Sequence, residues 1–153
     1  MTEDALRQYL HQHIPLSAAM GVEVLEASPH RVRLAAPLAP NINHRRTVFG
    51  GSAAALATLA AWALLHVRLS AEGFDGRLVI RRSVMDFEQP IAGRFEAVAD
   101  APDPHRWDRF RTAVTRRRPA RIEMRATLRF EGARAGAFTG EFVALPAGER
   151  DER

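Results

Sequence analysis

The stretch NINHRRTVFGGSAAALATLAAWALLH, Asn41 to His66, decides the fold of this chain. Two asparagines, an arginine pair and a double glycine stand directly before an alanine-rich run, and no charged residue occurs from Thr47 to Val67. An uncharged run of this length is long enough to cross a bilayer. Three interpretations therefore compete: a membrane span, a core helix, or a helix whose first turn forms the wall of a catalytic pocket.

Composition disfavours the membrane span. Seven of the residues from Ala53 to Ala63 are alanine, and Ser52 and Thr58 add polarity. Leucine and similar residues drive insertion into a bilayer, whereas alanine does so weakly. A helix that is apolar all round must then be enclosed by protein, and about 20 residues make a rod about 30 Å long. We expect a buried helix and no membrane association.

The surrounding segments predict short helices and amphipathic strands that can enclose this rod. Alternation is clearest in RIEMRATLRFE, where Ile122 and Met124 share one side and Arg121 and Arg125 the other. The expected elements are a helix over 3–14, a hairpin turning at 27–29, strands over 77–88 and 94–101, a helix over 105–118 lying on the sheet edge, and strands over 121–131 and 137–145. In the 77–88 strand the alternation changes phase near Arg81 and Arg82, which indicates a bulge or a strand partly buried on both faces.

One antiparallel sheet wrapped around one long helix is the hotdog architecture. The element order predicts this α+β fold as a single domain over residues 1–147, followed by a disordered tail over 148–153. With 153 residues the chain is long enough to enclose a substantial core. We find no internal repeat and no linker.

The charge and cysteine content exclude several functions. All 22 basic residues are arginine, so the sequence pI near 11.0 reflects arginine's high pKa more than a binding surface, because the formal net charge is only +4. Cysteine is absent, which removes disulfides, thiolate metal sites and cysteine nucleophiles. The start, TEDALRQYL, lacks the pattern of a secretory signal. We expect a cytoplasmic protein.

The double glycine indicates chemistry at the start of the long helix. A helix begins with unpaired backbone N–H groups and a partial positive charge. Gly50 and Gly51 have no side chains, so a substrate can approach these groups closely. The two glycines are therefore placed to polarise a carbonyl.

Three segments carry a resemblance to a known family. These are PLSAAMGVEV, the pattern NxNxxxTxFGGS and the final GEFVAL. In all three the chain resembles hotdog-fold thioesterases, and more closely the YiiD-type thioesterase domains, over nearly its whole length. The resemblance implies hydrolysis of an acyl-CoA or an acyl-carrier-protein thioester, without a cofactor, in fatty acid metabolism. It also implies a homodimer or a higher homo-oligomer with sites between subunits.

The resemblance also implies residue roles. Asn43 corresponds to the asparagine that precedes a His-Gly-Gly in related thioesterases, Phe49 stands in place of the histidine, and Thr58 stands where relatives carry a catalytic carboxylate. The predicted catalytic residues are Asn43, Gly50, Gly51 and Thr58. The predicted substrate-binding residues are Asn41, Arg45, Arg46, Phe49, Ser52 and Ser83.

Several alternatives stay open at this point. His44 could act as a base or be solvated. Asp86 could reach the pocket or a neighbouring subunit's pocket, or it could pair with Arg82 or Arg81. The clusters 45–46, 81–82 and 116–118 could meet coenzyme A phosphates, an acidic carrier protein or only solvent. Because Thr58 replaces a carboxylate, a non-catalytic acyl-CoA-binding or regulatory module is the alternative function. Nucleic-acid binding ranks last, and the six histidines lack the spacing of metal ligands.

Overall fold

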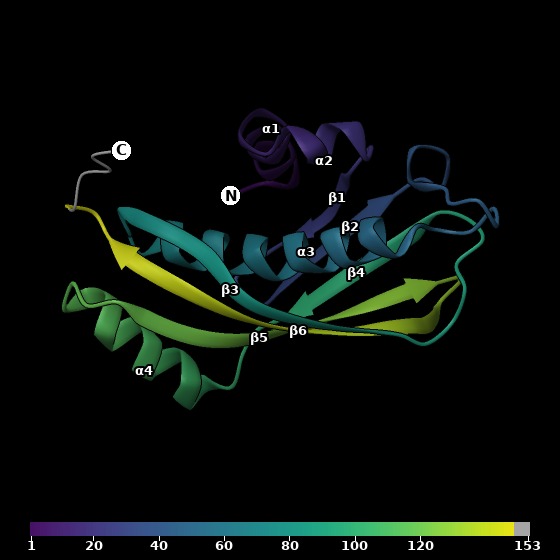
Figure 1. The fold of residues 1–153 in the computed structure, drawn as a ribbon. Helices are drawn as coiled ribbons and strands as arrows, with labels where there is room; N and C mark the ends of the chain where they lie inside the picture. Colours follow the sequence, from purple (N-terminus) through teal and green to yellow (C-terminus); the bar gives the residue numbers. More distant parts are fainter. Residues whose placement is uncertain (149–153) are drawn as a thin grey trace.

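A six-stranded antiparallel sheet curves around one long helix in the computed structural model, which describes residues 1–148 (Figure 1). The strand order is β1-β2-β4-β5-β6-β3. This is the α+β hotdog arrangement that the sequence predicts. In chain order the elements are α1 (Glu3–His13), α2 (Pro15–Ala19), β1 (Glu23–Ala27), β2 (Arg31–Ala36), the 3-10 turn η1 (Ala39–Asn41), α3 (Gly50–Ala71), β3 (Gly76–Phe87), β4 (Phe95–Asp100), α4 (Pro104–Thr115), β5 (Ala120–Phe130) and β6 (Ala133–Pro146).

Helix α3 forms the centre of the core. It packs against β2, β3, β4, β5 and β6, and eleven of its 22 residues are buried. Its buried alanines leave room for the strands to approach the helix closely. By length and composition α3 could cross a membrane, yet 61% of its most apolar 18-residue window is buried inside the protein, as in the core helix of a soluble fold.

Strands β5 and β6 form the hairpin beneath α3. The buried residues of β5 are the alternate ones, including Ile122, Met124 and Leu128, as predicted. Strand β6 begins at Ala133, earlier than expected. Glu131 and Gly132 both have positive φ angles, 49° and 77°, so a two-residue turn returns the chain directly into pairing.

Strand β3 forms one edge of the sheet and pairs only with β6. The register shifts between Ile80 and Arg82, which confirms the predicted bulge. Apolar side chains on this strand are unusually exposed: Val84 is 47% and Phe87 60% accessible. An edge strand with free backbone groups and exposed apolar residues is suited to pairing with another chain.

Helix α4 fills the place where β4 stops pairing. The pairing of β4 with β5 covers only residues 126–129 of β5, and α4 packs against that strand. Trp107 and Phe110 are buried there, and the guanidinium of Arg68 lies 4.0 Å from the Trp107 ring centre. The predicted helix at the sheet edge is therefore present, and it closes the core beside the second half of α3.

Helix α1 covers α3 through an aromatic stack. The Tyr9 ring lies 4.2 Å from the His13 ring and 4.4 Å from the His66 ring, and His66 stacks on Trp62 at 4.9 Å. The Nε2 atom of His66 is buried without a hydrogen-bond partner in the described part of the chain. Burial, and secondarily the nearby His13, lower the pKa of His66 below its usual 6.5.

The predicted disordered tail, residues 148–153, lies outside the described residues apart from Gly148. Its disorder therefore stays a prediction. So does the extent of a single domain over residues 1–147.

The lowered pKa of His66 predicts a pH dependence of folding. The His66 imidazole binds a proton more readily in the unfolded chain than in the folded one. The contribution of neutral His66 to stability is therefore complete above pH 6.5, and it is lost as the pH falls from that value through the lower pKa of the folded state. His66→Phe keeps a ring in the stack and should reduce the loss of unfolding free energy between about pH 7 and about pH 5.

Chemical denaturation at several pH values measures this effect. His30→Phe is the control, because His30 is exposed on the β1–β2 turn. Identical pH profiles for wild type and His66→Phe would contradict the prediction.

Candidate functional site

The first turn of α3 has free backbone donors. Phe49 occupies the N-cap position and makes no capping hydrogen bond, and the amide of Ala53 is the first to bond back, to the Phe49 carbonyl at 3.0 Å. Among residues 1–148, the amides of Gly50, Gly51 and Ser52 have no hydrogen-bond acceptor. Capping residues usually satisfy such groups, so a helix that begins without one leaves them for a ligand.

The loop before α3 is held rigidly at both ends. The Val48 amide donates to the Ile91 carbonyl at 2.8 Å, and the Phe49 amide donates to the Asn41 carbonyl at 2.7 Å. Ile42 and Val48 form an isolated antiparallel bridge. These bonds position the helix start independently of any substrate.

Asn43, one of the predicted catalytic residues, holds the tip of this loop. Its Oδ1 accepts from the amides of Arg45 and Thr47 at 2.8 and 3.1 Å. Its Nδ2 donates to Thr47 Oγ1 at 3.0 Å and to the Val48 carbonyl at 3.3 Å. An asparagine amide offers two acceptor and two donor positions, and all four are used inside the loop. The structure therefore gives Asn43 a positioning role.

Asn41 is also a loop residue, not the substrate contact expected from the sequence. Its side chain is only 2% exposed, and Nδ2 donates to the carbonyls of Met20 and Pro37 at 2.9 and 2.7 Å. These bonds tie the loop to the end of α2. The Oδ1 atom is buried without a hydrogen-bond partner among the described residues.

Two aromatic rings flank the glycines. A methyl group at Gly51 would overlap the Phe49 ring, and one at Gly50 would touch the Phe87 ring at 3.4 Å. Both rings are more than half exposed, at 57% and 60%. The glycines therefore lie between two apolar rings, and a side chain at Gly51 would have to displace one of them.

A cavity of about 300 Å³ opens beside Gly50. Apolar side chains line most of it, and Glu88 supplies the one carboxylate among the lining residues. Arg134 Nε lies 2.6 and 3.0 Å from the two carboxylate oxygens of Glu88, and this pairing raises the pKa of Arg134. The amides of Glu88 and Gln89 both donate to the Ala135 carbonyl, which fixes the backbone at the strand end.

Sequence reasoning missed Glu88. In the sequence Gln89 and Pro90 indicate only where the strand ends. Glu88 directly precedes them and has no pattern that would distinguish it from any charged residue at a strand end. The signal lies in the pairing of β3 with β6, which brings residues 88 and 134 together across 46 positions of sequence.

Thr58 and Ser83 lie away from the glycines within one chain. Thr58 follows Gly50 by eight residues, a rise of about 12 Å along the helix, and its hydroxyl donates to the Ala54 carbonyl at 2.8 Å. Ser83 is exposed on β3 and shares the helix-facing side with Phe87, since alternate residues point the same way. Ser52 is half-buried in the first turn of α3 beside the glycines.

Asp86 meets neither of the expectations for it that concern a single chain. It lies on the opposite face of β3 from Phe87 and so points away from the cavity. Arg81, one expected partner, instead donates to Glu141 at 2.7 Å. Within residues 1–148, no ion pair within 4.0 Å joins Asp86 to Arg82 either.

His44, Arg45 and Arg46 form the exposed tip of the loop. Arg46 has a φ of 63°, which is unusual for a residue with a side chain. Neither arginine has an ion-pair partner in the described part of the chain. The tip therefore offers two free guanidinium groups near the start of α3, where an anionic group of a substrate could bind.

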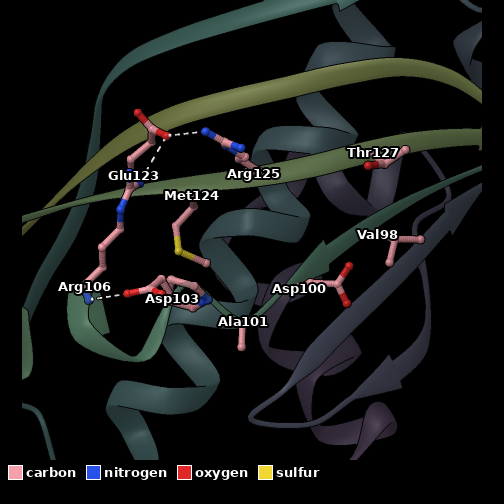
Figure 2. A pocket seen from close by; sticks show the side chains of 10 residues that line it. Val98, Asp100, Ala101, Asp103, Arg106, Glu123, Met124, Arg125 and Thr127 are labelled. Atoms are coloured by element: carbon pink, nitrogen blue, oxygen red, sulfur yellow. Dashed lines mark hydrogen bonds and ion pairs between the residues drawn. The ribbon is translucent and has the colours of Figure 1, made fainter. Parts of the chain in front are cut away.

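A larger hollow on the outer face of the sheet, of about 530 Å³, lacks these features (Figure 2). Its charged groups satisfy one another: Arg106 and Arg125 each lie 3.3 Å from Glu123, and Asp103 caps α4. We therefore place the candidate site at the start of α3. Over the described residues, no three histidine or acidic side chains gather in a way that could hold a metal ion.

Comparison with known proteins identifies a family and several similar structures. A family model described as "Putative thioesterase (yiiD_Cterm)" matches residues 3–146. A "putative thioesterase" from Shewanella oneidensis is 28% identical, with a TM-score of 0.85 over 94% of this chain and 97% of that one. A protein of unknown function from Chlorobaculum tepidum is 29% identical, with a TM-score of 0.88 over 95% and 97%. A mutant form of the phenylacetic acid degradation protein PaaI from Thermus thermophilus is 25% identical, with a TM-score of 0.63 over 86% and 98%.

The saturated amide of Asn43 predicts a structural effect of mutation. Asn43→Ala removes both acceptor bonds to loop amides and should lower the free energy of unfolding by about 1–3 kcal/mol. Asn43→Asp keeps the oxygen that accepts from the loop amides and loses only the Nδ2 donor, so it should lower the free energy of unfolding by less than Asn43→Ala does. Thermal and chemical denaturation of both variants compares the two losses. Unchanged stability in Asn43→Ala would rule out the loop-holding role.

Proposed function

The chain belongs to the family described as "Putative thioesterase (yiiD_Cterm)", and from this premise we propose that it hydrolyses an acyl thioester carried by coenzyme A or by an acyl carrier protein. The observation that carries the proposal is the uncapped start of α3, whose first residue, Gly50, lines a cavity. As parts of the same proposal, the protein acts in the cytoplasm and in fatty acid metabolism.

The chemistry follows from the groups beside the cavity. The amides of Gly50 and Gly51 donate to the thioester carbonyl oxygen and stabilise the negative charge that develops on it. Glu88 accepts a proton from a water molecule whose oxygen attacks the carbonyl carbon. The tetrahedral intermediate then breaks its carbon–sulfur bond, and the departing thiolate takes up a proton. The products are a carboxylic acid and a free thiol.

The remaining predicted residues have binding or positioning roles in this proposal. Phe49 and Phe87 bracket the acyl group with their exposed rings, and Ser52 lies beside the reacting carbonyl. Arg45 and Arg46 bind the phosphate of the pantetheine arm, a group that coenzyme A and carrier proteins share. Asn43 and Asn41 hold the loop that presents these residues.

A second copy of the chain completes the site in this proposal. Nine large apolar side chains are exposed among the described residues, and six of them lie on β3 or in the loop before α3: Ile42, Phe49, Val79, Ile80, Val84 and Phe87. We call this group the β3 surface. Exposed apolar area concentrated on an unpaired edge strand favours pairing with a second chain.

The sequence of β3 is complementary to itself. An antiparallel pair of β3 strands centred on Arg81 and Arg82 sets Val79 of one copy opposite Val84 of the other, and Arg77 opposite Asp86. Such a pair is two-fold symmetric, so each copy presents the same surface. The two α3 helices then run in opposite directions.

Pairing through β3 predicts a specific effect of charge. Val84→Asp places a carboxylate in the apolar pair and should weaken self-association about 100-fold or more, because a buried unpaired charge is costly. Leu25→Asp is the matched control, since Leu25 is an exposed apolar residue on β1, the opposite edge. Sedimentation or light scattering over a dilution series measures the association. A wild type that stays monomeric, or a loss caused equally by Leu25→Asp, would refute pairing through β3.

The hydrolase proposal predicts release of free thiol from acyl thioesters. A panel of acyl-CoA and acyl-carrier-protein substrates of different chain lengths should include one that wild type hydrolyses. Glu88→Gln should reduce kcat by about 100-fold or more if the carboxylate takes up the water proton. Glu23→Gln is the control, because Glu23 also pairs with an arginine at 2.6 Å but lies on β1. Absence of thiol release from every substrate would overturn the proposal.

A non-catalytic acyl-binding module is the alternative. It is favoured by Thr58, which stands where relatives carry a carboxylate and whose hydroxyl is bonded to its own helix backbone. This alternative predicts tight acyl-CoA binding with no thiol release. Equilibrium binding measured beside the activity assay separates the two functions.

A further inference from the structure

The positive charge of the protein is concentrated in one segment. Residues 104–121, which comprise α4 and the start of β5, contain seven arginines and one aspartate. The whole chain carries a formal net charge of only +4, so the other residues carry more acidic than basic side chains. Such asymmetry indicates a surface for an anionic partner.

Four arginines of this segment have no ion-pair partner within 4.0 Å among residues 1–148: Arg109, Arg116, Arg117 and Arg118. All four are exposed. Three others are paired with glutamates: Arg106 with Glu123, Arg111 with Glu72 and Arg121 with Glu141. We call the four unpaired residues the α4 arginine cluster.

The surface beneath the cluster is hollowed and partly apolar. A hollow of about 500 Å³ lies between α4 and β5, and Ala113 and Pro119 supply the accessible apolar part of its lining. A second hollow, of about 350 Å³, adjoins it and is bordered by Arg109, Arg116 and Arg118. A partly apolar floor with guanidinium groups on its rim fits a protein helix whose apolar residues are flanked by carboxylates.

Acidic residues on the same rim argue against nucleic acid. Glu141 borders the first hollow and Asp108 the second. Carboxylates repel a phosphate backbone, whereas a protein partner of mixed polarity can avoid them or hydrogen-bond to them. Phe110 is buried, so it is unavailable to stack on a base.

Within one chain the cluster is remote from the candidate site. Arg111 lies 4.0 Å from Glu72, at the end of α3, whereas Gly50 begins that helix 22 residues earlier, about 33 Å away. In the antiparallel pair proposed above, the end of α3 in one copy lies beside the start of α3 in the other. The cluster of one copy then lies at the same end of the pair as the cavity of its neighbour.

We infer that the α4 arginine cluster is the docking surface for an acidic carrier protein, whose acyl-bearing arm enters the cavity of the neighbouring copy. This inference rests on the proposed function, because the carrier brings the thioester that the site hydrolyses. It also identifies the substrate class: the acyl group arrives on an acidic protein. Free acyl-CoA has no need of the cluster, since its phosphate meets Arg45 and Arg46.

The test compares two double variants of equal charge change. Arg116→Ser with Arg118→Ser removes half of the cluster, and Arg31→Ser with Arg33→Ser is the control, because those two arginines are paired with Asp100 and Glu96 on a different part of the sheet. Binding of an acyl carrier protein that bears no acyl group is measured by calorimetry at low and high salt. The cluster variant should bind about tenfold more weakly than wild type, and the control should bind like wild type.

Hydrolysis gives an independent readout. The cluster variant should lose kcat/KM with acyl carrier protein by a similar factor and keep it with acyl-CoA of the same chain length. Equal losses with both substrates would overturn the inference, as would carrier binding that neither variant affects. Tighter binding to a single-stranded oligonucleotide than to the carrier would also overturn it.

The two proposals fail separately. Carrier binding that depends on the cluster without hydrolysis of any thioester would overturn the proposed function and leave the docking surface standing. Hydrolysis of acyl-CoA without carrier binding would overturn the docking surface and support the proposed function.

Discussion

The enclosure of α3 is the constraint on which the rest of the structure depends. A helix of 22 residues that is apolar on every side has to be surrounded by protein, and a six-stranded sheet is the means by which this chain surrounds it. The alanines of α3 allow the strands to approach, while the buried phenylalanines Phe95, Phe138 and Phe142 come from the sheet. The short elements α1 and α4 cover what the sheet leaves open, and both do so through aromatic side chains.

Much of the fold follows from patterns that a sequence displays locally. The alternation in β5 and the uncharged run of α3 each report the environment of their own side chains, so both could be predicted without knowing their neighbours. The early start of β6 could not, because it depends on Glu131 adopting a positive φ beside Gly132. Glutamate rarely adopts a positive φ, and no local sequence pattern predicts that Glu131 does so.

The candidate site was less predictable, because its members are brought together by pairing between distant strands. Gly50 and Gly51 could be identified, since the physics of a helix start is local. The roles of Asn41 and Asn43 could not, because an asparagine that orients water and one that holds a loop have the same sequence. Only the hydrogen-bond partners distinguish them, and the partners of Asn41 include Met20, which lies 21 positions earlier in the chain. Glu88 could be identified only from the structure, in which the pairing of β3 with β6 places it beside Arg134.

The two edges of the sheet are unequal, and this limits how the protein can assemble. Strand β1, at one edge, has only five residues, bears Glu23 and Glu26, and is interrupted by a register shift between Val24 and Glu26. Short, charged and irregular edges resist the addition of further strands. A chain with one receptive edge and one unreceptive edge cannot polymerise into a continuous ribbon, so growth through the sheet stops once the receptive edge is covered.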